Sequence, residues 1–187
     1  MENNQITSLL LILGTVLIYT GFGAFPPRIY TEKNVQEKLN MLAAQPRRWI
    51  LSQSFVIMGG IATVAGSIVL PTLFRESLVA LLAKIGVVGF VLGHVFWIWH
   101  VGLRTAQPQK FAMNELPGWL FKIYSIPTLS ALAVFGVAFW LHGTHRVLGT
   151  GLFFGALLVL GLFLKFKDMP PFVYYAMTLA IGLTLLF

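Results

Sequence analysis

The feature that most constrains this chain is a series of long apolar stretches separated by short polar segments. A membrane-spanning helix needs roughly 20 apolar residues, because the hydrocarbon core is about 30 Å thick and a helix rises about 1.5 Å per residue. We therefore expect an all-α, polytopic membrane helical bundle that forms a single transmembrane domain over residues 1–187. The sequence predicts about six transmembrane helices, at Ile6–Phe25, Trp49–Leu70, Ser77–Leu103, Trp119–Leu141, Val147–Leu164 and Phe172–Phe187.

The composition supports the same class of protein. Only 10% of the 187 residues are charged, against about 25% in an ordinary soluble domain, so a bilayer is the expected solvent. The chain has no cysteine, which excludes disulfides, thiolate metal sites and a cysteine nucleophile.

The longest polar segment, Arg28–Arg48, follows the first span. Thr31 is a suitable N-cap for a helix that begins at Glu32, and apolar residues then recur at helical spacing. This pattern predicts a short cytoplasmic amphipathic helix on the membrane surface. Its basic residues and the arginine after the third span are expected to contact anionic headgroups or a partner: Arg28, Lys33, Lys38, Arg47, Arg48 and Arg104.

The distribution of Lys and Arg predicts the orientation. The first, third and fifth loops carry nine of these residues and the second and fourth carry two. Because basic loops stay in the cytoplasm, we place loops one, three and five there and both termini outside, in the plasma (inner) membrane. Membrane lipids are the expected partners of these basic loops, and no nucleic acid is expected.

The third span is the most informative stretch, and it divides into two faces when wound at about 100° per residue. One face carries Gly86, Gly89 and Gly93, followed by Trp97, His100 and Arg104. Small residues let another helix approach closely, so this face predicts a packing seam with a neighbouring helix or another membrane subunit. Trp97 and Trp99 are typical of the aromatic belt at a membrane interface.

His94 stands apart from the glycine face, near the middle of the span, where a polar side chain is costly and is often functional. One interpretation is a haem, quinone or pigment site, or a proton relay. The alternative is a neutral imidazole bonded to an ordinary partner such as Ser130, Tyr124 or Tyr19.

Two further residues of the span are candidates for a ligand site. His100 lies nearer the cytoplasmic edge than His94 and points about 120° away from it on an ideal helix. No other histidine shares the depth of His94, which argues against a bis-histidine haem. Lys84 either reaches the outer headgroups or binds a substrate.

His142 and His145 lie three residues apart in the outer turn after the fourth span. They are a weak candidate metal site, because a sound site requires a third or fourth ligand and supporting partners. As interfacial turn residues they need no metal.

No Ser-His-Asp set, Walker loop or dinucleotide glycine motif occurs, so the sequence favours a non-catalytic integral membrane protein. The expected role is an accessory subunit, or a module that binds lipid or a hydrophobic cofactor, within a larger complex. A small redox protein or enzyme that uses His94 is one alternative. A transporter or channel is another, although no carboxylate lies within a span.

The run GFGAFPPRIYTEKNVQEKLNMLAAQPRRWILSQ resembles a pattern in uncharacterised prokaryotic small multi-pass membrane proteins. In these proteins a first span ends in prolines, an amphipathic segment follows, and a tryptophan opens the second span. The resemblance implies the span arrangement and carries no activity, cofactor or site residue.

Overall fold

The computed structural model describes residues 3–167 and 169–187, and within these ranges the chain is helical with no strand. Five helices are long and apolar enough to cross a membrane. The elements are α1 (Asn3–Ala24), α2 (Arg28–Thr31), α3 (Val35–Ala44), α4 (Pro46–Val69), η1 (Leu70–Leu73), α5 (Ser77–Ala106), α6 (Pro108–Ala112), α7 (Gly118–His142), α8 (Arg146–Phe166) and α9 (Phe172–Leu186).

The predicted spans correspond to α1, α4, α5, α7, α8 and α9, with bounds that differ by a few residues at each end. The chain therefore has the build of a helical membrane protein. Helix α9 is the shortest of the six, with 15 residues. At about 1.5 Å per residue it is shorter than the roughly 30 Å hydrocarbon core, so a sixth complete span stays a prediction.

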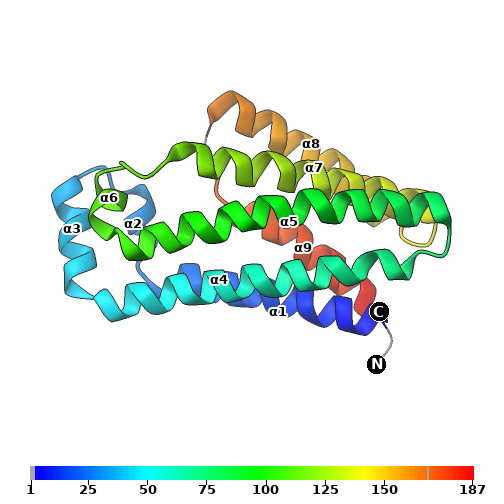
Figure 1. Cartoon of the computed structure of the whole chain (residues 1–187), viewed down its shortest axis with the longest axis horizontal. Helices are drawn as coiled ribbons and strands as arrows, with labels where there is room; N and C mark the ends of the chain where they lie inside the picture. Colours follow the sequence, from blue (N-terminus) through cyan, green and yellow to red (C-terminus); the bar gives the residue numbers. More distant parts are fainter. Residues whose placement is uncertain (1–2, 168) are drawn as a thin grey trace.

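The six long helices lie side by side along the long axis of the molecule (Figure 1). Helix α1 packs against α4 and α9, α5 packs against α4 and α7, and α8 packs against α7. The last helix therefore returns to the first instead of packing mainly on α8, its neighbour in sequence. The start of α1 and the end of α9 lie together at one end of the molecule, and the short helices α2, α3 and α6 lie at the other end.

Pairs of glycines set the closest helix contacts. Helices α1 and α4 meet at Gly14 and Gly59, where a Cβ on Gly14 would lie 2.7 Å from the carbonyl oxygen of Gly59. Helices α7 and α8 meet in the same way at Gly136 and Gly149, again with 2.7 Å from an added Cβ to the opposite carbonyl oxygen. Only residues without side chains permit these backbones to approach so closely.

The short helices at one end of the bundle form a helical cap, which we define as α2 and α3, between α1 and α4, together with α6, between α5 and α7. The segment between α1 and α4 contains a helix, α3, which begins at Val35 with Asn34 and not Thr31 as its N-cap. The Asn34 side chain accepts hydrogen bonds from the backbone N–H groups of Gln36 (2.9 Å) and Glu37 (3.3 Å). Thr31 instead ends α2, so the predicted start was three residues too early.

The apolar face of α3 packs within the chain. Leu42 is buried in a small core together with Phe25, Ile29, Trp49 and Ala112. The indole of Trp49 stacks on Phe111 of α6 at 5.1 Å between ring centroids. This core fixes the cap on the end of the bundle, and contact of α3 with the membrane surface stays a prediction.

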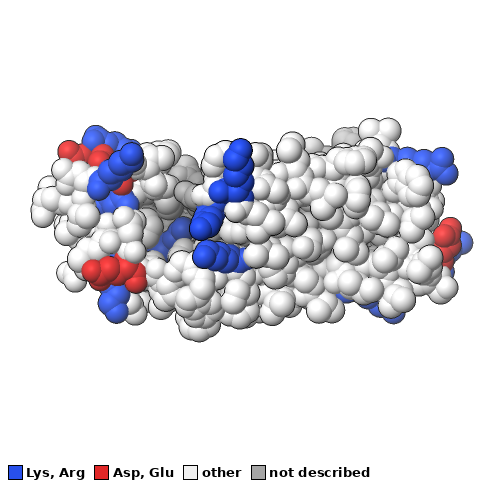
Figure 2. All heavy atoms as spheres, turned by 90° about the horizontal axis from the view of Figure 1, so that it is seen from above, with Lys and Arg blue, Asp and Glu red and all other residues white. Residues whose placement is uncertain are grey.

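On the face shown in Figure 2, charged side chains extend from one end almost to the middle of the long axis and occur again at the other end, with an uncharged stretch between them. The long helices carry many exposed apolar side chains, such as Leu81, Val88 and Leu158. Such a surface is stable in lipid and would aggregate in water.

Candidate functional site

His94 lies inside the bundle, with 1% of its surface exposed. Its Nδ1 lies 2.9 Å from the carbonyl oxygen of Phe90, one turn earlier in α5. A carbonyl can only accept, so Nδ1 carries the proton and Nε2 of the neutral ring is an acceptor. The Tyr175 hydroxyl of α9 lies 3.3 Å from Nε2 and donates to it. Both ring nitrogens therefore have partners within the chain.

Aromatic rings enclose the same imidazole. It stacks on Phe90 at 4.1 Å between centroids, and Tyr124 and Tyr175 meet it edge-on at 5.7 and 5.9 Å. Among the partners expected from sequence, Tyr124 is a ring neighbour, whereas Ser130 is exposed and Tyr19 donates to the Phe172 carbonyl. Sequence reasoning missed Tyr175. The adjacent tyrosines 174 and 175 near the start of α9 were the available signal.

The glycine face of α5 packs against α7 of the same chain. A Cβ on Gly86 would lie 2.5 Å from the Phe135 ring, and one on Gly93 would collide with Thr128. Gly89 faces the carbonyl oxygen of Pro127. An additional membrane subunit remains a prediction, but this face is already occupied by α7.

Trp97 is a core residue with 0% exposure, so its assignment to an interfacial belt is wrong. Its indole stacks on Tyr124 at 4.6 Å. Trp99, on the opposite side of α5, is 50% exposed and keeps the position expected of a belt residue.

His100 is 6% exposed and lies between the rings of Trp97 (6.1 Å) and Phe121 (6.3 Å). Among the described residues, His100 Nδ1 and Trp97 Nε1 have no hydrogen-bond partner although both atoms are buried. Buried polar groups normally find partners. These two atoms, more than His94, are therefore available to a polar group of a ligand or to water.

Arg104 ends the same face and contacts the cap. Its guanidinium lies 5.8 Å from the ring of Tyr30, 5.3 Å from Trp97 and 5.4 Å from Phe111. Its backbone carbonyl accepts from the Trp49 indole at 3.3 Å. Arg104 thus holds the cap against α5, a role that its assignment to headgroup contact did not include.

The other basic residues of this end divide into three groups. Lys38 is 5% exposed, bonds to Asn114 Oδ1 at 3.3 Å and lies over the Phe111 ring, so it is turned inward. Arg28 is ion-paired with Glu32 and Glu37. The remaining basic residues of the cap region are on the surface: Lys33, Arg47, Arg48 and Lys110, of which Arg48 donates to the Ala24 carbonyl.

Two lysines lie on the outside of the long helices. Lys84 of α5 is exposed, which is compatible with a side chain that reaches the headgroups. Lys122 of α7 is also exposed, and sequence reasoning overlooked it inside the fourth predicted span.

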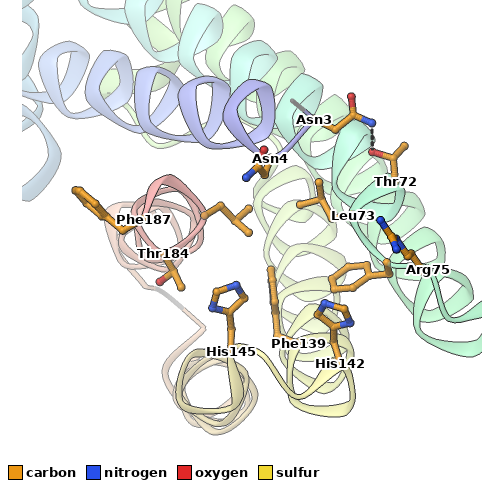
Figure 3. Close-up of a pocket in the computed structure, with 12 residues that line it drawn as sticks. Asn3, Asn4, Thr72, Leu73, Arg75, Phe139, His142, His145, Thr184 and Phe187 are labelled. Atoms are coloured by element: carbon orange, nitrogen blue, oxygen red, sulfur yellow. Dashed lines mark hydrogen bonds between the residues drawn. The ribbon is translucent and has the colours of Figure 1, made fainter. Parts of the chain in front are cut away.

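His142 and His145 line a pocket of about 470 Å³ at the end where α1 begins and α9 ends. We call it the terminal pocket. Figure 3 shows the two imidazoles on opposite sides of Phe139. His142 packs on Phe74 at 5.2 Å and His145 on Phe139 at 6.1 Å between ring centroids. No group of three or more His, Asp or Glu side chains among the described residues is placed to hold a metal ion.

Comparison of the chain with known protein families, curated proteins and solved structures finds no match.

Proposed function

We propose that the chain is a non-catalytic, multi-pass membrane protein that acts as an accessory component of a larger membrane complex. The observation that carries the proposal is the environment of His94. His94, a buried polar residue of α5, uses both ring nitrogens within the chain. A ligand at Nε2 would have to displace the Tyr175 hydroxyl, so a structural role fits the geometry best.

Purification from native membranes tests this role. After gentle solubilisation, the chain should co-purify with other membrane proteins in stoichiometric amount. Its absorption spectrum should lack a visible band that depends on His94. A colourless preparation without partners would contradict the accessory role. A visible band that is lost in His94→Ala but kept in the exposed control Lys84→Gln would establish a His94 cofactor site instead.

A second candidate is the binding of a quinone or another hydrophobic cofactor beside His100. It is favoured by the buried, unpartnered atoms His100 Nδ1 and Trp97 Nε1 within an aromatic surrounding. An N–H donor next to aromatic rings suits a carbonyl on a flat apolar ligand. Organic extraction of the purified protein should then yield a quinone or pigment that is lost in His100→Leu and retained in His94→Gln.

We also propose that the cap faces the cytoplasm. Three of the 13 Lys and Arg residues lie at the end that holds the terminal pocket: Arg75, Lys84 and Arg146. The other ten lie at or near the cap end. This imbalance, with the positive-inside rule, supports a cytoplasmic cap and outer termini.

The absence of native cysteine makes this orientation directly testable. In intact cells a membrane-impermeant maleimide should label Arg75→Cys and should not label Lys110→Cys until the cells are opened. The reverse pattern would invert the proposed orientation.

A further inference from the structure

The terminal pocket gathers side chains from five parts of the chain. They come from the first turn of α1, from η1 and the turn after it, from the end of α7, from the turn before α8 and from the end of α9. Its volume of about 470 Å³ falls within the usual range of small-molecule sites, roughly 300–1,000 Å³. The fold therefore builds a concave site from segments that are distant in sequence.

The titratable side chains that line the pocket are all basic. Arg75, His142 and His145 line it, and no Asp or Glu side chain is among the lining residues described. None of the three side chains makes a hydrogen bond or ion pair with another described residue, and His142 Nδ1 is a buried atom without a partner. The local charge thus favours an anion.

Among the neutral polar groups, the Asn4 carboxamide keeps donors for a ligand, whereas the Thr72 and Thr184 hydroxyls already donate within the chain. Thr72 donates to the Val69 carbonyl (2.7 Å) and accepts from Asn3 (3.0 Å), and Thr184 donates to the Ala180 carbonyl (2.8 Å). The Asn4 carboxamide oxygen accepts from the backbone N–H of Gln5 (2.9 Å), which leaves its NH₂ group free. Figure 3 shows Asn4, Arg75, His142 and His145 around the same space.

We propose that the terminal pocket binds a phosphate anion, carried on a lipid headgroup or free in solution. A guanidinium suits this ligand because its fork of N–H groups matches two phosphate oxygens. The imidazoles and the Asn4 amide supply further donors, and Phe74 and Phe139 form an apolar side compatible with a lipid. The inference does not depend on the accessory role, because the site lies at the opposite end from the cap.

A test uses the full chain in detergent with two probes. Thermal unfolding is measured with and without inorganic phosphate. Native mass spectrometry compares retention of phosphatidylglycerol with retention of a diacylglycerol that has the same acyl chains and no phosphate. The variants are Arg75→Gln, His142→Gln and Arg75→Lys, and the matched control is Lys84→Gln, an exposed cation near the same end.

The proposal expects Arg75→Gln to bind the phosphate probe roughly tenfold more weakly, as for the loss of one charge-assisted hydrogen bond. The His142→Gln variant should also lose affinity, whereas Arg75→Lys should keep part of it and Lys84→Gln all of it. A response to inorganic phosphate identifies a free anion as a sufficient ligand. A response to phosphatidylglycerol alone identifies the headgroup.

Three results would overturn the proposal. The first is no binding of either probe by the wild-type chain, and the second is equal binding by Arg75→Gln and Lys84→Gln. The third is that the pocket binds Zn²⁺ and not phosphate, and that this binding requires His142 and His145. The pocket would then be a metal site. Circular dichroism of each variant shows whether it is still folded. Arg75→Lys keeps the positive charge, so it tests the site even if Arg75→Gln fails to fold.

Discussion

The Nε2 atom of His94 lies 3.3 Å from the hydroxyl oxygen of Tyr175, which joins α5 to α9 across 81 residues of sequence. These two helices pack mainly on other neighbours, α5 on α4 and α7, and α9 on α1. The bond therefore connects parts of the bundle that helix packing alone leaves weakly attached.

The first prediction concerns this bond. Tyr175→Phe should lower the free energy of unfolding by about 0.6–2 kcal/mol, because it leaves His94 Nε2 buried without a donor. Thermal unfolding in detergent measures the change. The control Tyr19→Phe removes an exposed hydrogen bond to a backbone carbonyl and should cost less. An equal loss of stability in the two variants would show that the His94–Tyr175 bond stabilises the fold no more than the exposed Tyr19 bond.

The second prediction concerns the glycine face of α5. Gly93→Ala should destabilise the chain by about 1–3 kcal/mol, because its Cβ would collide with Thr128 and lie 2.8 Å from the Tyr124 carbonyl oxygen. Gly102→Ala, on the same helix with nothing within 4 Å of the added Cβ, should cost nothing. Melting temperatures of both variants in one detergent test this. A Gly93→Ala protein as stable as Gly102→Ala would contradict the close contact with α7.

The third prediction concerns the cap. Arg104→Gln should weaken its attachment by about 1–3 kcal/mol, because the guanidinium lies near three aromatic rings and each such contact contributes about 0.5–1 kcal/mol or more. The expected readout is faster proteolysis within residues 28–45 while the long helices remain protected. Arg47→Gln removes an exposed cation nearby and should leave the cleavage rate unchanged.

The fourth prediction concerns pH and the start of α3. The Glu32 carboxylate accepts hydrogen bonds from the backbone N–H of Asn34 (2.9 Å) and from the Arg28 guanidinium (2.7 Å). These bonds lower the pKa of Glu32 from an ordinary 4.5 to about 2. A lowered folded-state pKa contributes stability above pH 4.5, and this contribution is lost as the pH falls toward 2.

Hydrogen exchange in α2 and α3 between pH 5 and pH 2 measures this effect, after correction for the intrinsic pH dependence of exchange. Protection should fall over this interval in the wild-type chain. Glu32→Gln should start with lower protection and show a flatter profile. An unchanged profile in Glu32→Gln would assign the pH dependence to another group.

The spans could be predicted from the sequence because membrane crossing depends on local composition. An apolar run of sufficient length has to be helical in lipid, since every backbone polar group must be bonded within the segment. The glycine face of α5 was also recognisable, because three glycines at helical spacing leave a groove whichever helix fills it. The paired glycines Gly14 with Gly59 and Gly136 with Gly149 were not, because the partner of a lone glycine is chosen by the fold.

The sequence by itself determined the helical membrane architecture, the approximate ends of the spans and the candidate status of His94. The tertiary structure alone decided that Tyr175 satisfies His94, that Trp97 is buried, and that Arg75, His142 and His145 share a pocket. The physical reason is that hydropathy is a property of each segment. The partner of a side chain depends instead on helix rotation and on which helices are neighbours, and here α9 returns to α1.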